Sequence, residues 1–211
     1  MSHRRERVAR VYDRIAPFYD WYESPMDLVG GRDRRMRVAG GAHGKVLEVG
    51  VGTGRNLPLY PDDAEITAID VSERMLEQAR KRAADLDRPV QLEWANVESL
   101  PFGDGSFDTV AATCVFCSVE DPVAGLREVR RVVKVDGQVR LLEHVRPGNP
   151  LLGKVFDWLS PLTRTLFGPE INRRTEENVR KAGFELVDVK RDGIWREIVA
   201  RPASASGEGD R

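Results

Sequence analysis

The chain of 211 residues is 41% hydrophobic and 32% charged with a formal net charge of −1, a composition that predicts one soluble globular domain. Its balanced charge and the absence of a groove-reading motif argue against nucleic acid as a partner. No run approaches the roughly 18 apolar residues of a membrane span, and the arginine-rich start lacks the apolar stretch of a secretory signal.

The first predicted element is a helix over residues 4–16, which Pro17 should end because the residue before a proline avoids the helical conformation. Apolar side chains such as Val8 and Tyr12 recur at helical spacing on one side, and arginines occupy the other. We interpret residues 1–37 as a helical lid whose aromatic side chains meet an acceptor substrate, with residues 1–22 contacting an anionic membrane surface. The alternative is a helix that only covers the edge of the core and leaves its arginines in solvent.

From residue 45 onward, strand and helix patterns alternate, which indicates a parallel α/β sheet with helices on both faces. The predicted strands are 45–49, 65–70, 90–95, 107–113, 138–143, 184–190 and 194–200. The predicted helices after the first are 72–86, capped by Ser72, then 122–133 and 174–182. The Asp192-Gly193 pair is a hairpin signal, so the last strand should run antiparallel to its neighbour. We expect a single domain over residues 1–202 and a disordered tail over 203–211.

Residues 146–173 do not fit this alternation, because the segment is too long for a simple connection. It is rich in leucine and aromatic residues and contains four prolines. Long apolar insertions at the ligand edge of such a sheet commonly build a substrate pocket, so we predict an acceptor-side insert. The alternative is an excursion of the chain that only enlarges the core.

The stretch Val46 to Gly54 predicts a nucleotide-like cofactor. A buried strand leads into Gly50, Gly52 and Gly54, and glycines after a strand permit a tight turn and close approach of a ligand. A dinucleotide loop has the spacing G-x-G-x-x-G, which this stretch does not match. Glu48 just before the loop would repel a pyrophosphate but suits an ammonium or sulfonium group. The sequence therefore favours S-adenosylmethionine over NAD.

Two polar residues follow the next two predicted strands. Asp70 lies twenty residues after Gly50, where a carboxylate can accept hydrogen bonds from a ribose diol. The alternative for Asp70 is an acid that only stabilises the start of the following helix. Asn96 ends the third predicted strand, where its amide can address an adenine edge.

The motifs YDRIAPFYD, VLEVGVGTG, ITAIDVSERMLEQAR, ANVESLPFGDGSFDTV and LREVRRVVKVDGQVRLLEH cover about residues 11–144. On these motifs the chain resembles a class I S-adenosylmethionine-dependent methyltransferase of the ubiquinone/menaquinone-biosynthesis type. The resemblance implies a Rossmann-like, seven-stranded, mostly parallel sheet of order 3-2-1-4-5-7-6 with the last strand antiparallel. It also implies methyl transfer from S-adenosylmethionine with release of S-adenosylhomocysteine.

The cofactor-binding candidates are Tyr19, Glu48, Gly50, Gly52, Thr53, Asp70, Val71, Met75, Asn96, Val97 and Thr113. By the resemblance, the glycines and Thr53 contact the methionine part and Asp70 the ribose. Val71 and Met75 would flank the adenine, whose edge Asn96 and Val97 would approach. The family usually has Asp at position 96, so this chain offers an acceptor there without the charge.

Two groups within the family are the most similar in their motifs. Bacterial phospholipid N-methyltransferases share the tyrosine-rich start and the EVGVGTG run, and membrane-associated thiol methyltransferases share CxxCSV and EHV. We therefore expect a hydrophobic or membrane-associated acceptor, with N-methylation of a phospholipid amine such as phosphatidylethanolamine as the first hypothesis. The alternatives are S-methylation of alkyl thiols, C-methylation of a quinone precursor, or a binding protein without catalysis.

The catalytic candidates are His144, Tyr12 and Tyr19. His144 at the end of the fifth predicted strand could take a proton or orient the acceptor, and its alternative is a purely structural role. The tyrosines could shape the acceptor pocket or hold an ammonium group over their rings. Cys114 and Cys117 lack the second cysteine pair of a zinc site, so no metal is predicted. Two cysteines and no export signal predict a cytoplasmic protein, located on the inner face of the membrane if it associates with one. The sequence indicates no oligomeric state.

Overall fold

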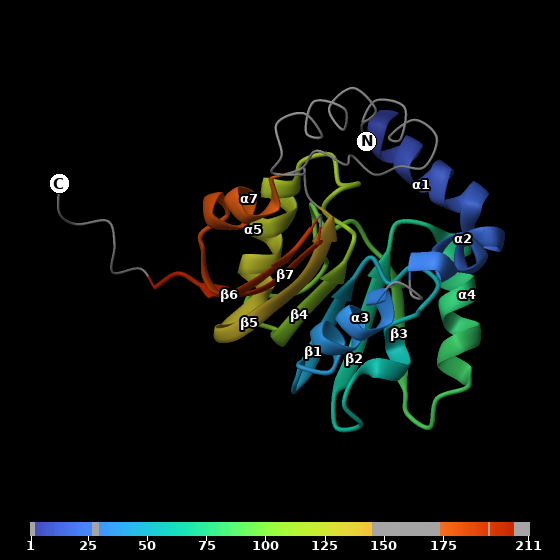
Figure 1. Ribbon diagram of the computed structural model, residues 1–211, viewed down its shortest axis with the longest axis horizontal. Helices are drawn as coiled ribbons and strands as arrows, with labels where there is room; N and C mark the ends of the chain where they lie inside the picture. The colour runs from blue at the N-terminus through green and yellow to red at the C-terminus, as the bar shows by residue number, and fades with distance from the viewer. Residues whose placement is uncertain (1–2, 27–29, 145–173, 194, 205–211) are drawn as a thin grey trace.

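A central seven-stranded sheet organises the chain (Figure 1). The computed structural model describes residues 3–26, 30–144, 174–193 and 195–204. The strands are β1 Lys45–Val49, β2 Glu65–Asp70, β3 Val90–Trp94, β4 Phe107–Thr113, β5 Val133–His144, β6 Phe184–Asp192 and β7 Trp195–Pro202. Their order is β3-β2-β1-β4-β5-β7-β6, with β7 antiparallel to β5 and β6 and the other pairs parallel. The predicted Rossmann-like order and the reversed last strand are confirmed.

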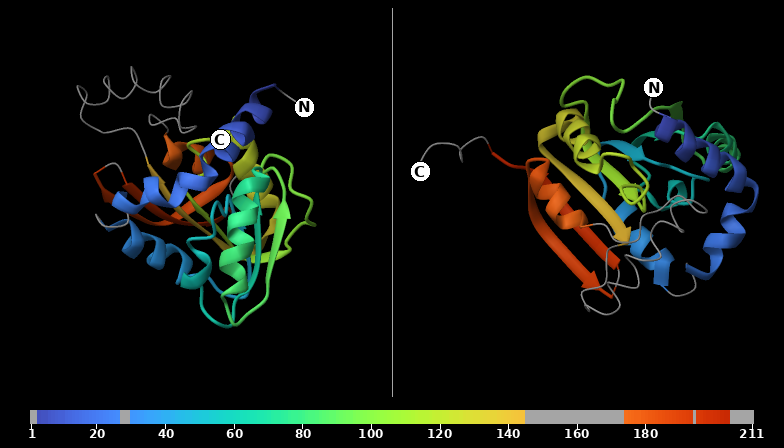
Figure 2. Two further views of the ribbon diagram at one scale, coloured as in Figure 1. Left: turned by 90° about the vertical axis from the view of Figure 1, so that its right-hand side faces the viewer. Right: turned by 90° about the horizontal axis from the view of Figure 1, so that it is seen from above.

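Helices cover both faces of the sheet (Figures 1 and 2). They are α3 Arg32–Ala39, the short 3-10 helix η3 Leu57–Leu59, α4 Glu73–Ala84, α5 Pro122–Val132 and α7 Thr175–Lys181. One core holds residues of α5 and α7, and the other holds residues of α3, η3 and α4. Because side chains alternate along a strand, β1 supplies Leu47 and Val49 to the first core and Val46 to the second.

The N-terminal segment forms α1 His3–Ile15, the 3-10 helix η1 Ala16–Phe18 and α2 Tyr19–Met26. The first helix ends before Pro17 as predicted. α2 and most of α3 lie in the 1–37 segment that was interpreted as a helical lid, for which no further helix bounds were predicted. Two acids fix this segment to the rest of the molecule. Asp13 accepts a 2.6 Å hydrogen bond from Ser72 Oγ, and Asp20 accepts one of 2.6 Å from Thr53 Oγ1. None of the described helices combines the length and apolarity that a membrane crossing requires.

The start of β5 differs from the sequence-based expectation. The strand was predicted to begin at residue 138, but α5 passes directly into β5 at Val133. Val133 pairs with Phe107, and the register then shifts so that Gln138 pairs with Thr109. Residues 134–137 therefore form an irregularity inside β5, between these two pairs, of the kind seen at a β-bulge.

Two predicted features fall largely outside the described residues. The whole 146–173 insert lies there, as do residues 205–211 of the expected tail. Residues 203–204 are described, and Ala203 donates its N–H to the Gly183 carbonyl at 2.9 Å. The last helix before β6 ends as predicted, because Gly183 with a φ of 87° follows its last turn.

Candidate functional site

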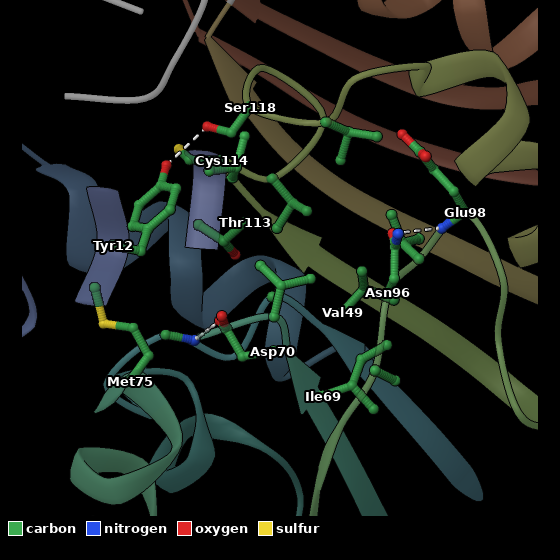
Figure 3. Close-up of a pocket in the computed structure, with 18 of the residues that line it drawn as sticks. Tyr12, Val49, Ile69, Asp70, Met75, Asn96, Glu98, Thr113, Cys114 and Ser118 are labelled. Atoms are coloured by element: carbon green, nitrogen blue, oxygen red, sulfur yellow. Dashed lines mark hydrogen bonds between the residues drawn. The ribbon is translucent and has the colours of Figure 1, made fainter. Parts of the chain in front are cut away.

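A cavity with an empty volume of about 820 Å³, open mouth included, lies at the carboxyl ends of β1, β2 and β4 (Figure 3). This is the edge at which open α/β sheets bind ligands. Its lining residues are Val8, Tyr12, Tyr19, Val49, Gly50, Gly52, Ile69, Asp70, Val71, Met75, Ala95, Asn96, Val97, Glu98, Thr113, Cys114, Val115, Ser118, Val119 and Glu120. Nine of the eleven predicted cofactor residues are in this set.

The glycine loop after β1 forms one wall of the cavity. Gly50 and Gly52 have φ values of 65° and 55°, in the left-handed region that favours glycine. A Cβ on Gly50 would come within 2.5 Å of Val115 Cγ2, whereas a Cβ on Gly52 would meet nothing within 4 Å. Gly52 therefore faces open space, which allows a ligand to approach the backbone there.

Asp70 links the end of β2 to this loop. Its Oδ2 accepts the Gly52 N–H at 2.9 Å, and its Oδ1 accepts the Ser72 N–H at 2.9 Å. Burial raises the pKa of Asp70 to about 6, although these backbone donors act in the opposite direction. Each carboxylate oxygen can accept a further hydrogen bond, so the fixed carboxylate has capacity for a ligand hydroxyl in the cavity.

The apolar side of the cavity is formed by Val71, Met75 and Val97 together with the amide residue Asn96. Met75 belongs to the first turn of α4, which Ser72 caps by accepting the Met75 N–H at 3.2 Å. Asn96 accepts the Glu98 N–H at 3.0 Å through Oδ1, which holds its side chain in the turn after β3 (Figure 3). A flat apolar group can pack between these side chains with a polar group at its edge.

Tyr12 and Tyr19 close the cavity from the N-terminal segment, with ring centroids 6.3 Å apart. The Tyr12 hydroxyl lies 2.7 Å from Ser118 Oγ (Figure 3). Burial and nearby thiols raise the pKa of Tyr12 far above its ordinary value. Tyr12 is therefore protonated at neutral pH and cannot take a proton from a substrate.

Glu48 and Thr53 do not line the cavity. Glu48 is only 1% exposed and accepts a 2.9 Å hydrogen bond from Asn56 Nδ2 behind the loop. Burial raises the pKa of Glu48 to about 8, and the bond from Asn56 only partly offsets this effect. Thr53 donates to Asp20 on α2 instead. The two residues therefore connect the loop to Asn56 and to α2 and are not among those that line the cavity.

His144 is the last residue of β5, and its side chain lies outside what the structure describes. Its neighbour Glu143 is fully buried, and Oε1 accepts the N–H groups of Val115 and Phe116, both at 2.9 Å. The turn after β4 is thereby fixed to β5. Cys117 is buried and donates to the Cys114 carbonyl at 3.2 Å, and no cluster of three possible metal ligands occurs among the described residues.

Several lining residues were not singled out from the sequence. Val8 belongs to the apolar side of α1, and the turn after β4 contributes Cys114, Val115, Ser118 and Val119. Cys114 adopts a φ of 55°, a conformation that is uncommon for a residue with a side chain. Small residues directly after a predicted strand indicate a turn in the sequence. The contact of Ser118 in this turn with Tyr12 depends on tertiary structure and has no such signal.

The charge of the lining is one-sided. It contains three carboxylates, Asp70, Glu98 and Glu120, and the described lining residues include no lysine, arginine or histidine. The remainder is mostly apolar. Such a cavity stabilises a positively charged or neutral ligand more than an anion.

Comparisons with known proteins agree with this geometry. A family model described as a methyltransferase domain matches residues 47–141. The chain is 32% identical over 168 residues to the ubiquinone/menaquinone biosynthesis C-methyltransferase UbiE of Citrifermentans bemidjiense. The matched region covers 74% of this chain and 71% of that protein. The chain is 36% identical over 151 residues to the phosphatidylethanolamine N-methyltransferase of Cereibacter sphaeroides, with coverages of 69% and 72%. Among solved structures, an S-adenosylmethionine-dependent methyltransferase of Thermotoga maritima has a TM-score of 0.72 at 23% identity, covering 92% of this chain and 99% of that one.

Proposed function

The chain belongs to the class I S-adenosylmethionine-dependent methyltransferases of the ubiquinone/menaquinone-biosynthesis type, and from this premise we propose that it methylates a phospholipid amine such as phosphatidylethanolamine. The observation that carries the proposal is the acidic, otherwise apolar lining of the cavity, which includes Glu98 and Glu120 and no described basic side chain. An amine reaches such a site as an ammonium ion, which the carboxylates attract.

The family uses S-adenosylmethionine, and its binding follows from the residues at the cavity. Asp70 would accept hydrogen bonds from the ribose hydroxyls. Gly50 and Gly52 would lie along the methionine part, where their missing Cβ atoms allow close approach. The adenine would pack between Val71 and Met75.

The acceptor would enter between the N-terminal segment and the turn after β4. Methyl transfer requires a lone pair aligned with the methyl–sulfur bond and the exclusion of water, so positioning supplies most of the rate. Val8, Val119 and the two tyrosines form an apolar wall suited to this task. Because Tyr12 stays protonated, its role would be to position the acceptor by a hydrogen bond or by cation–π contact.

The amine must lose a proton before it can attack the methyl group. His144 at the end of β5 remains our proposal for the group that takes this proton or orients the acceptor. Glu98 and Glu120 at the cavity attract the ammonium form and so increase the local concentration of the substrate.

A lipid acceptor requires contact with a membrane surface. Phe18 and Trp21, on η1 and α2, are 70% and 81% exposed, which is unusual for large aromatic residues. Arg10 and Arg14 on the neighbouring helix α1 are exposed as well. Aromatic rings with nearby cations are typical of segments that insert shallowly at an anionic lipid surface. We propose that this part of the molecule docks on the membrane, which brings the lipid head group to the cavity.

A second candidate, C-methylation of a quinone precursor, is favoured by the similarity to the C-methyltransferase of Citrifermentans bemidjiense. S-methylation of alkyl thiols is a third. Radiolabelled methyl transfer from S-adenosylmethionine to phosphatidylethanolamine vesicles, alkyl thiols and a demethylated quinone precursor separates them. We expect label in the phosphatidylethanolamine fraction. Label in another acceptor alone would replace the proposal, and no label with any acceptor would indicate a binding protein without catalysis.

A further inference from the structure

A buried amide, Asn56, joins the glycine loop to the end of β4. Asn56 is only 3% exposed and lies two residues after Gly54, the last glycine of the loop. The Nδ2 group donates to Glu48 Oε1 at 2.9 Å and to Thr113 Oγ1 at 3.0 Å. An amide nitrogen carries two protons, so these two bonds use both of them.

This arrangement determines the direction of the Thr113 hydroxyl group. Thr113 lines the cavity, and its oxygen accepts from Asn56 on the buried side. The hydroxyl proton is therefore available to a ligand atom in the cavity. A hydrogen-bond acceptor on the ligand is the partner that this geometry selects.

The position of β4 in the sheet indicates which ligand atom this is. β4 neighbours β1 on the side opposite to β2, so Thr113 and Asp70 lie on opposite sides of the glycine loop. If Asp70 holds the ribose, the methionine part extends across the loop toward Thr113. In that part only the α-carboxylate accepts hydrogen bonds at neutral pH, because the sulfonium and ammonium groups offer no available lone pair. The described lining also provides no cationic side chain for this carboxylate, which must then use neutral donors.

We propose that Asn56 is a positioning residue that holds the Thr113 hydroxyl as a hydrogen-bond donor to the α-carboxylate of bound S-adenosylmethionine. Glu48 contributes by accepting the other Nδ2 proton, which fixes the orientation of the amide. The inference rests on the proposed cofactor site and does not depend on the identity of the methyl acceptor.

The first test compares two ligands, S-adenosylmethionine and its decarboxylated analogue, by calorimetry on the full chain. Thr113→Val removes the hydroxyl and should weaken binding of S-adenosylmethionine roughly 10- to 100-fold, as expected for a hydrogen bond to a charged group. Binding of the decarboxylated analogue should stay within about twofold of wild type, because its methionine part has no acceptor for this proton. Thr113→Ser keeps the hydroxyl and should bind S-adenosylmethionine more tightly than the decarboxylated analogue, as wild type does. An equal loss for both ligands would overturn the proposal.

The second test reverses the direction of the hydrogen bond with the same two functional groups. In Glu48→Gln/Asn56→Asp the amide and the carboxyl group exchange places. At pH 9, where a carboxyl buried like that of Glu48 is ionised, Thr113 donates to the carboxylate introduced in place of the Asn56 amide and presents only a lone pair to the cavity. We expect this double variant to bind S-adenosylmethionine as weakly as Thr113→Val, with no further loss when the two changes are combined. The control Val187→Ser changes an exposed residue on β6 that does not line the cavity, and it should bind both ligands as wild type does.

Unchanged affinity of a folded double variant for S-adenosylmethionine would contradict the proposal. Circular dichroism establishes whether the double variant is folded, and the two Thr113 variants decide the question if it is not. Failure of the proposed function gives a different result, because a wild-type chain that binds neither ligand would remove the cofactor site altogether.

Discussion

The carboxylate of Asp70 at the end of β2 accepts the N–H of Gly52 in the glycine loop at 2.9 Å. This bond connects the residue proposed for the ribose with the backbone proposed for the methionine part. A second backbone bond from Ser72 fixes the other oxygen. The carboxylate therefore has one orientation before the ligand arrives, and little ordering is required on binding.

Removal of this carboxylate should weaken the cofactor site. We expect Asp70→Ala to lower the affinity for S-adenosylmethionine roughly 10- to 100-fold or more, because two hydrogen bonds to a charged group are lost. Calorimetry with S-adenosylhomocysteine measures the change without turnover. The same affinity in Asp70→Ala and wild type would contradict the ribose assignment.

The raised pKa of Asp70 makes cofactor binding dependent on pH. Ribose hydroxyls donate to the ionised carboxylate, so the ligand binds the deprotonated protein more tightly. Since burial raises this pKa to about 6, the affinity should be constant above pH 7 and fall as the pH drops to 5. The decrease approaches about tenfold per pH unit well below the pKa. Asp70→Asn cannot ionise and should bind weakly with no such slope, and an equal slope in this variant would assign the titration to another group.

Glu48 should make the free energy of unfolding dependent on pH. Its pKa in the folded chain, about 8, lies above the ordinary value of 4.5 because of burial. The protonated form is favoured by the fold, so the stabilisation is complete below about pH 4.5 and is lost as the pH rises to 8. Glu48→Gln still accepts from Asn56 but cannot ionise. Between pH 5 and 9 wild type should lose roughly 3 to 5 kcal/mol more than this variant. Parallel urea-unfolding curves of the two proteins at pH 5 and 9 would contradict this assignment.

The sheet, the glycine loop after β1 and the position of Asp70 at the end of β2 could be predicted because each depends on local pattern, whereas the roles of the loop and of Asp70 in cofactor binding stay predictions. Buried strands, glycines and Ser72 carry their signal within a few residues, and this part of the fold was confirmed. Glu48 shows the limit of such reasoning. Its position before the loop suggested contact with a cation, but the direction of its side chain depends on Asn56, which packs behind the loop.

The acceptor side was less predictable for the same physical reason. Ser118 forms a hydrogen bond with Tyr12, which is 106 positions away in the sequence. The two side chains meet only because α1 packs against the rest of the molecule. The start of β5 was also missed, because it depends on the pairing of Val133 with Phe107 on the neighbouring strand β4. Long-range contacts of this kind leave no periodic signal.

The contact between α2 and the glycine loop should control the opening of the N-terminal segment. Asp20 accepts from Thr53 Oγ1 at 2.6 Å and from Arg82 Nη2 at 2.7 Å. Burial alone would raise the pKa of Asp20, but these donors outweigh it and the net pKa is lowered. The side chain is partly exposed, so its ion pair contributes only about 0–1 kcal/mol. We expect Asp20→Ala to increase trypsin cleavage at Arg10 and Arg14 a few-fold. The matched control Asp104→Ala removes an exposed partner of Arg131 and should leave cleavage at Arg10 and Arg14 unchanged. Equal cleavage rates in wild type, Asp20→Ala and Asp104→Ala would show that the Asp20 contact does not control the opening of the N-terminal segment.

Phe18 and Trp21 should determine how strongly the protein binds a membrane. Both rings project from the N-terminal segment, where insertion at a lipid interface would remove apolar surface from water. We expect Phe18→Ser/Trp21→Ser to reduce flotation with phosphatidylglycerol-containing vesicles roughly tenfold. The control Val187→Ser changes an exposed apolar residue on β6, away from this segment, and should float as wild type does. Replacing Arg4, Arg7 and Arg10 with glutamine should instead weaken binding most at low salt, because it removes attraction to anionic lipid. Equal flotation of the aromatic double variant and wild type would exclude this surface as the membrane contact.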